Sequence, residues 1–173
     1  MIIMNIFDIM GKKSPNRILK MFIQNPTTEM QLKNIESSTK LAKLSVLKWT
    51  KCLAGQKLLT VRSVGRTALY GLNKDNPSVK QLRILHNLNY IDSKLGHVDG
   101  KVFLYGSFTR GENTEKSDID ILVIGKNRDV IKKLKSMDSR INVSFYTPVE
   151  WSMAARKDKA FFNNVEKDKI RLR

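Results

Sequence analysis

The sequence predicts an α+β chain in two parts: three helices with a strand hairpin, and then a small α/β domain with a mixed sheet. Three observations predict this fold class. Apolar residues recur at helical spacing through much of residues 14–54. Two short apolar runs then flank Gly65, as the strands of a hairpin would. Beyond residue 100, apolar runs of strand length alternate with polar turns and helical patterns.

A chain of 173 residues can hold one ordinary domain or two small ones. The polar segment 73–77 reads as a turn or linker and is a candidate domain boundary. We therefore expect a first domain over residues 1–76, a connecting helix over 77–99 and a second domain over 100–173. One apolar face of the connecting helix could also support a homodimer. It is formed by Val79, Leu82, Leu85, Leu88 and Ile91.

The charge of the chain is strongly positive. It carries 32 lysine and arginine residues against 16 acids, which gives a formal net charge of +16. From Lys33 to Arg66, eight basic residues accompany one acid, Glu36. An excess of this size favours a polyanionic partner, and nucleic acid is favoured over an anionic membrane.

Cys52 is the only cysteine of the sequence. An intrachain disulfide and a cysteine-based zinc finger are therefore excluded, and a reducing, cytoplasmic location fits. The apolar start MIIMNIFDIM lacks a basic leader and is too short to span a bilayer. We expect no membrane partner, because no other apolar run is long enough to cross one.

The first part reads as three helices. The first begins at Ser14-Pro15 and ends at Asn25-Pro26. The second begins after a cap at Thr27 or Thr28, and the third runs from about residue 43 to a stop at Gly55. In these last two helices we expect a buried set of Met30, Leu32, Ile35, Leu44, Val46, Leu47, Cys52 and Leu53.

Residues 58–61 and 67–72 read as the two strands around Gly65. Three helices followed by a basic hairpin resemble a winged helix-turn-helix over residues 12–75, with 44–59 as recognition helix and lead into the wing. The resemblance implies double-stranded DNA as partner and a role in transcription regulation: the helix enters the major groove and the hairpin reaches flanking phosphates. The alternative to DNA binding is that these lysines form an ordinary solvent-exposed helix face. The candidate DNA-binding residues are Lys43, Ser45, Lys48, Lys51, Arg62 and Arg66.

The second part centres on residues 104–125. Asp118 and Asp120 stand two apart at the start of an apolar strand, so both point to the same face of the sheet. Carboxylates this close repel unless a cation lies between them, and paired Asp oxygens suit Mg²⁺. Gly106-Ser107, at the end of another apolar run, can admit a phosphate to the backbone. A phosphate-binding turn beside a metal-binding site is what phosphoryl or nucleotidyl transfer requires.

These residues resemble the nucleotidyltransferase superfamily that includes DNA polymerase beta and the small minimal nucleotidyltransferases. The family pattern runs from Gly-Ser through a second Gly to Ser-Asp-x-Asp, and the match covers roughly residues 100–147. The resemblance implies a nucleoside triphosphate as substrate or ligand, with Mg²⁺ or Mn²⁺ as cofactor. It assigns nucleotide binding to Gly106, Ser107, Arg110 and Ser117, and catalysis and metal binding to Asp118 and Asp120.

The family's third carboxylate normally stands on the next strand, which we expect over residues 141–146. Asn142 holds the corresponding position. An amide can ligate a metal through its carbonyl oxygen but cannot act as a base. Two hypotheses therefore stay open: a Mg²⁺-dependent nucleotidyltransferase that acts on an unknown acceptor, or a DNA-binding transcriptional regulator whose transferase-like domain only binds nucleotide or scaffolds.

Overall fold

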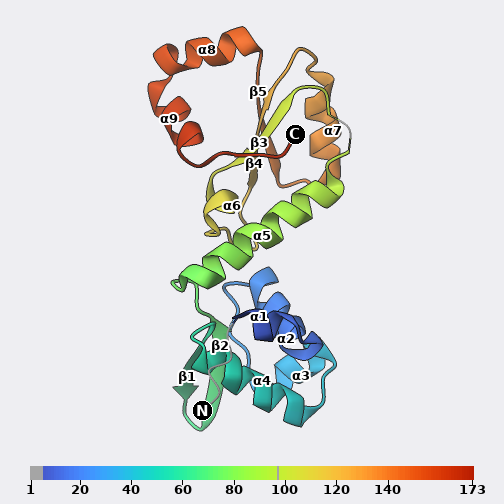
Figure 1. Cartoon of the computed structure of the whole chain (residues 1–173), viewed down its shortest axis with the longest axis vertical. Coiled ribbons are helices and arrows are strands. Elements are labelled where there is room, and N and C mark those ends of the chain that lie inside the picture. Colours follow the sequence, from blue (N-terminus) through green and yellow to red (C-terminus); the bar gives the residue numbers. More distant parts are fainter. Residues whose placement is uncertain (1–5, 97) are drawn as a thin grey trace. The chain divides into compact units, whose positions relative to one another are not determined.

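The computed structural model describes residues 6–96 and 98–173 (Figure 1). They form two compact units that divide between Leu82 and Arg83. Unit 1 contains four helices and a two-stranded sheet among the described residues. Their bounds are α1 (Ile6–Met10), α2 (Lys13–Gln24), α3 (Leu32–Thr39), α4 (Lys43–Gly55), β1 (Leu59–Val64) and β2 (Thr67–Leu72).

The core of unit 1 is apolar and draws on every one of its larger helices. Phe22 of α2, Ile35 of α3 and Leu53 of α4 are fully buried and pack in one cluster with the hairpin. Strands β1 and β2 pair antiparallel around a turn at Gly65, whose φ of 58° favours glycine. The expected order of three helices and a hairpin is therefore present.

Two expectations for this unit were wrong in detail. Met30 does not lie in the second helix: it forms an antiparallel bridge with Tyr70, and α3 begins only at Leu32. The bridge satisfies the backbone groups of both residues with bonds of 2.8 and 2.9 Å. Leu44 does not face the core either, because α4 buries Val46, Trp49, Thr50 and Leu53 instead and leaves Leu44 80% exposed.

Unit 2 is an α/β layer structure, in which α5 is shared with the end of unit 1. Its sheet has the order β5-β4-β3-β6, with β4 and β5 parallel and the other pairs antiparallel. The sheet is therefore mixed, as expected. The element bounds are α5 (Pro77–Lys94), β3 (Lys101–Tyr105), α6 (Ser107–Arg110), β4 (Ile119–Ile124), α7 (Asp129–Met137), β5 (Ile141–Tyr146), α8 (Pro148–Lys157), α9 (Lys159–Asp168) and β6 (Ile170–Arg171).

The two faces of the sheet have separate cores. Alternation along β4 sends Ile119, Ile121 and Val123 to the face that α5 and α7 cover. It sends Leu122 to the face covered by α8 and α9 (Figure 1). Trp151 and Val165 pack against Leu122 on that face. Because Asp120 has the parity of Leu122, its carboxylate lies on the α8/α9 face.

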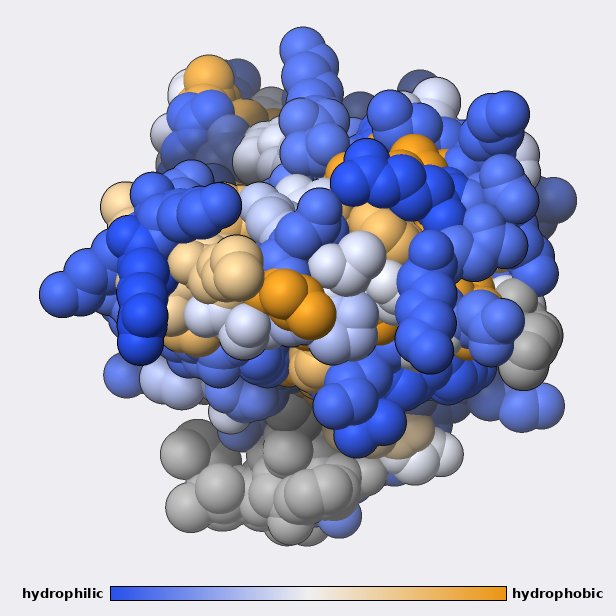
Figure 2. All heavy atoms as spheres, turned by 90° about the horizontal axis from the view of Figure 1, so that it is seen from above, coloured by the Kyte–Doolittle hydropathy of each residue, from blue (hydrophilic) through white to orange (hydrophobic). Residues whose placement is uncertain are grey.

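None of the helices in the described part of the chain has the length and hydropathy that a bilayer-crossing segment requires. Figure 2 shows a face of the molecule on which hydrophilic residues surround a few small hydrophobic areas.

Candidate functional site

The Gly-Ser turn joins β3 to α6. Gly106 adopts φ 77°, which disfavours any residue with a side chain, and Ser107 then opens α6. The turn is closed by Thr109, whose hydroxyl donates a 2.7 Å hydrogen bond to the Gly106 carbonyl oxygen. A Cβ at Gly106 would lie 2.7 Å from Oδ2 of Asp120. The missing side chain is therefore what lets the Asp120 carboxylate approach the turn.

Asp120 lies on the central strand between two partners. It is opposite Tyr105 of β3 in the antiparallel register and opposite Asn142 of β5 in the parallel one. The Asn142 Nδ2 group donates a 3.3 Å hydrogen bond to Oδ1 of Asp120. Strand pairing thus brings Asn142 to the position beside the second aspartate, where the family pattern has an acid.

Burial raises the pKa of the half-buried Asp120 carboxyl above its ordinary value. The hydrogen bond from Asn142 lowers that pKa, the negative charge of Asp118 raises it, and the charge of Arg110 lowers it. Asp118 precedes β4 and is exposed. The two carboxylates therefore repel each other, and a cation between them would remove this repulsion.

The donor set fits a hard cation. Two carboxylates and one amide oxygen are the ligand types that Mg²⁺ or Mn²⁺ prefers, with other positions left to water and phosphates. In the described ranges, no group of three or more His, Cys, Asp or Glu side chains is placed to hold a metal ion. Any cation at Asp118 and Asp120 would therefore be held by fewer protein charges than in a three-carboxylate site.

Arg110 is held by ion pairs instead of pointing alone into solvent. Its Nε atom lies 2.9 Å from Glu112 Oε2, and its Nη1 atom pairs with Oδ2 of Asp168, at the end of α9. These hydrogen bonds raise the pKa of Arg110. Because the side chain is 45% exposed, it can still reach an anion. Asp168 was not expected at the site, since it lies within the charged run of residues 166–169.

Ser117 shapes the loop in front of β4. Its Oγ accepts a 2.8 Å hydrogen bond from the backbone N–H of Thr114 and lies 3.2 Å from the Thr114 hydroxyl. This local turn directs the chain into β4 and so determines the position of Asp118. Its predicted contact with nucleotide stays a prediction.

Two buried polar residues of α5 support the loop that follows α6, and sequence reasoning missed both. Asn87 donates to the Phe108 carbonyl at 2.9 Å and to Asn113 Oδ1 at 2.8 Å. Arg83, only 2% exposed, donates to the Asn113 carbonyl. The signal was a four-residue spacing: Arg83 and Asn87 stand in line with Val79 and Ile91 on the buried side of the helix.

In unit 1, the predicted DNA-binding residues divide into two groups. Lys43, Lys48 and Lys51 of α4 are exposed, and Ser45 is half-buried. Arg66 is exposed in the hairpin turn. Arg62 instead makes a two-bond ion pair with Glu29, with distances of 2.9 and 2.7 Å from Nε to the two carboxylate oxygens. The structure thus leaves the α4 lysines and Arg66 accessible and engages Arg62 within its own unit.

Gly106→Ala should leave the fold in place but disturb the site, and Gly65→Ala supplies the control. Both glycines have positive φ, so each substitution should cost about 1–2 kcal/mol in free energy of unfolding. A Cβ at Gly65 meets nothing within 4 Å, whereas one at Gly106 must displace Asp120. Nucleotidyl transfer, the activity that the family resemblance implies, should then fall about a hundredfold in Gly106→Ala alone. Denaturant unfolding and transfer assays measure the two effects, and equal activity of the two variants would contradict the placement of Asp120.

Comparison with known proteins found a family model and a relative that match parts of this chain. The family model "Nucleotidyltransferase domain" matches residues 88–171, just under half of the chain. A protein of Methanocaldococcus jannaschii named "Putative protein adenylyltransferase" is 47% identical over 38 residues, which cover 22% of this chain and 38% of that relative. No solved structure matches the chain. The residues that match this family model include the Gly-Ser turn, both aspartates and Asn142.

Proposed function

We propose that this chain is a DNA-binding nucleotidyltransferase, which transfers a nucleoside monophosphate from a nucleoside triphosphate to an acceptor with Mg²⁺ or Mn²⁺. The observation that carries the proposal is the position of Asp120. Its carboxylate packs against the Gly106-Ser107 turn on one side and lies beside Asn142 on the other. A phosphate bound at this turn would therefore lie next to the carboxylate.

Each group has a role that follows from its chemistry. Gly106 lets phosphate oxygens approach the backbone, and the Ser107 hydroxyl can donate a hydrogen bond to them. Asp118 and Asp120 would hold the metal ion, which would offset charge on the phosphates. An acceptor hydroxyl oxygen attacks the α-phosphorus in line and its proton passes to water. The bond from that phosphorus to the bridging oxygen breaks, and pyrophosphate leaves with the electron pair.

Asn142 favours a second candidate function, that of a regulator which binds nucleotide without turning it over. Its amide cannot take the proton of an acceptor hydroxyl. Asp138, the acid nearest to Asn142 in the sequence, is engaged by other residues. Asp138 pairs with Arg140 at 2.9 Å and accepts a hydrogen bond from Tyr90. Under the second function, the protein would bind nucleoside triphosphate and leave it intact.

Mass spectrometry of candidate acceptors separates these two functions. The full-length protein is incubated with each of the four nucleoside triphosphates, Mg²⁺ or Mn²⁺, and an acceptor, which is RNA, a protein or the chain itself. A mass gain of one nucleoside monophosphate supports the enzyme. Saturable binding of nucleotide with no mass gain in any acceptor supports the regulator instead.

The DNA-binding half of the proposal is supported by the element order and by the charge of unit 1. The turn between α3 and α4 begins at Lys40, which caps α3 in the left-handed conformation with φ 52°. Helix α4 follows with exposed Lys48 and Lys51 on one stripe, and the hairpin adds exposed Arg66. These positive side chains suit the phosphates on either side of a major groove.

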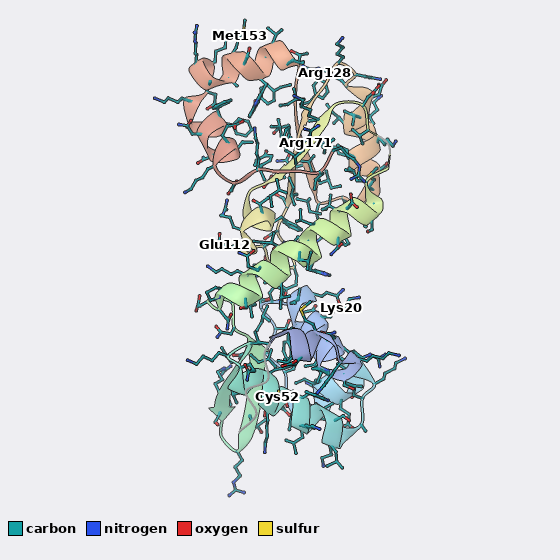
Figure 3. The ribbon with its side chains drawn as sticks, viewed as in Figure 1. Lys20, Cys52, Glu112, Arg128, Met153 and Arg171 are labelled. Atoms are coloured by element: carbon teal, nitrogen blue, oxygen red, sulfur yellow. The ribbon has the colours of Figure 1, made fainter. Side chains whose placement is uncertain are left out.

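Charge reversal provides a direct check of this surface. The affinity of wild-type protein for duplex DNA should fall as salt rises, and Lys48→Glu or Arg66→Glu should each lower the slope of log affinity against log salt by about 0.9. Lys20→Glu, on α2 (Figure 3), makes the same change of charge outside the surface and should leave the slope unchanged. Fluorescence anisotropy at several salt concentrations measures the slopes. Binding without salt dependence, or equal slopes in all four proteins, would contradict the assignment.

A further inference from the structure

The most exposed large apolar side chain in the described part of the chain lies on α4. Leu44 is 80% exposed, whereas the others of this kind reach at most 62%. Single exposed apolar residues are common in proteins, so exposure alone indicates nothing. What sets Leu44 apart is its place on the helix.

Leu44 is the second residue of α4 and begins the stripe that continues through Lys48 and Lys51 at spacings of four and three residues. The core does not use it, because α4 buries the opposite set, Val46, Trp49, Thr50 and Leu53. No side-chain cap covers the start of α4, where Ala42 holds the cap position. The first turn of α4 therefore presents one apolar side chain at the end of a row of cations.

This arrangement matches the chemistry of a DNA base edge. In a helix that enters the major groove, residues near the N-terminus contact the bases while cations contact phosphates. Of the four bases, thymine alone presents an apolar group there, its 5-methyl. A leucine side chain has no hydrogen-bonding atom, so it can discriminate among base pairs only through that methyl group or by shape.

We infer that Leu44 is a specificity-determining residue that recognises thymine in the major groove through the 5-methyl group. The inference rests on the proposed DNA-binding function and adds the base to it. It assigns selectivity to Leu44 and sequence-independent affinity to Lys48 and Lys51.

The test uses deoxyuridine, which differs from thymidine only by the absent methyl. Full-length protein selects duplexes from a pool of random sequence, and each thymine of the selected site is then replaced singly by deoxyuridine. Loss of one buried methyl should weaken binding about fourfold at one or two thymines. The Leu44→Ala protein should bind the thymine duplex as weakly as wild type binds the deoxyuridine duplex. It should bind its two duplexes with equal affinity. The exposed side chain can be shortened without loss of the core, which circular dichroism checks.

Two control variants test whether the effect is specific to Leu44. Leu85→Ala removes another exposed leucine, 50% exposed on α5, and should keep the full thymine–deoxyuridine difference. Lys48→Ala should weaken both duplexes equally. Sequence-selective binding with no deoxyuridine effect at any position, or an effect that survives Leu44→Ala, would overturn this inference alone. Failure to bind any duplex would overturn the DNA-binding function together with it.

Discussion

Nucleotidyl transfer should fall about a thousandfold when Asp118 and Asp120 are both replaced by asparagine, because loss of the two charges proposed to bind the metal ion removes about 4 kcal/mol of transition-state stabilisation. The replacement keeps the size of both side chains, so the packing of residue 120 against Gly106 is preserved. Initial rates with α-labelled nucleoside triphosphate and Mg²⁺ measure the effect.

The stability of this variant distinguishes a damaged site from a damaged fold. Burial raises the pKa of Asp120, so the ionised carboxylate opposes folding at neutral pH. The asparagine variant carries no such charge and should unfold at a temperature no lower than that of wild type. Asp129→Asn removes an exposed acid of the same unit and should leave the rate unchanged. A double variant that retained more than a tenth of wild-type transfer would rule out these aspartates as catalytic residues.

Asp138→Asn should have the largest effect on stability, with a loss of about 2 kcal/mol in the free energy of unfolding. The carboxyl side chain is 9% exposed and connects α5 with the turn that precedes β5. It accepts hydrogen bonds from Arg140 Nη2 at 2.9 Å and from the Tyr90 hydroxyl, and it lies 3.7 Å from Lys94 Nζ. Chemical denaturation of both proteins measures the loss.

The pH dependence of this loss has a definite sign. The hydrogen bonds from Arg140 hold the pKa of Asp138 well below its ordinary value, and the bond from Tyr90 lowers it further. A carboxyl with a depressed pKa stabilises the folded state above its unfolded pKa of about 4 and loses that contribution as pH falls further. The gap between wild type and Asp138→Asn should thus be full at pH 7 and shrink below about pH 4.

Asp92→Asn is the matched control for Asp138. Asp92 pairs with Arg173 at 2.6 Å, but its side chain is 55% exposed, so water and salt screen the pair. Its loss should cost less than about 1 kcal/mol. A cost as large as that of Asp138→Asn, or a gap for Asp138→Asn that did not depend on pH, would contradict the buried network.

The sequence predicted most elements because their apolar spacing agrees with the local structure. The mixed sheet and the Gly106 turn were expected, and the helix expected over residues 77–99 is present but ends at Lys94. Asn142 was also expected beside the aspartates, and the parallel pairing of β4 and β5 places it there. Side chains alternate between the two faces of a sheet with a period of two residues. The register of two paired strands therefore determines which side chains lie beside each other.

The errors arose where tertiary contacts override local pattern. Met30 fits a helical pattern, yet its backbone groups bond to Tyr70 and extend the hairpin sheet. Leu44 also fits a buried helical position, but the core of α4 lies on the other side. The four-residue spacing on α5 indicates that Arg83 is buried but does not identify its partner Asn113, and no spacing connects Asp168 with its partner Arg110.

The nucleotidyl-transfer proposal depends on which phosphorus atom of the triphosphate is attacked. The decisive measurement incubates wild-type protein, Mg²⁺ and acceptor with nucleoside triphosphate labelled at either the α- or the γ-phosphate, and follows the label into acceptor and pyrophosphate. We expect α-label in the acceptor and γ-label in released pyrophosphate. Transfer of γ-label to the acceptor, or no transfer of α-label from any of the four nucleotides, would contradict the proposal.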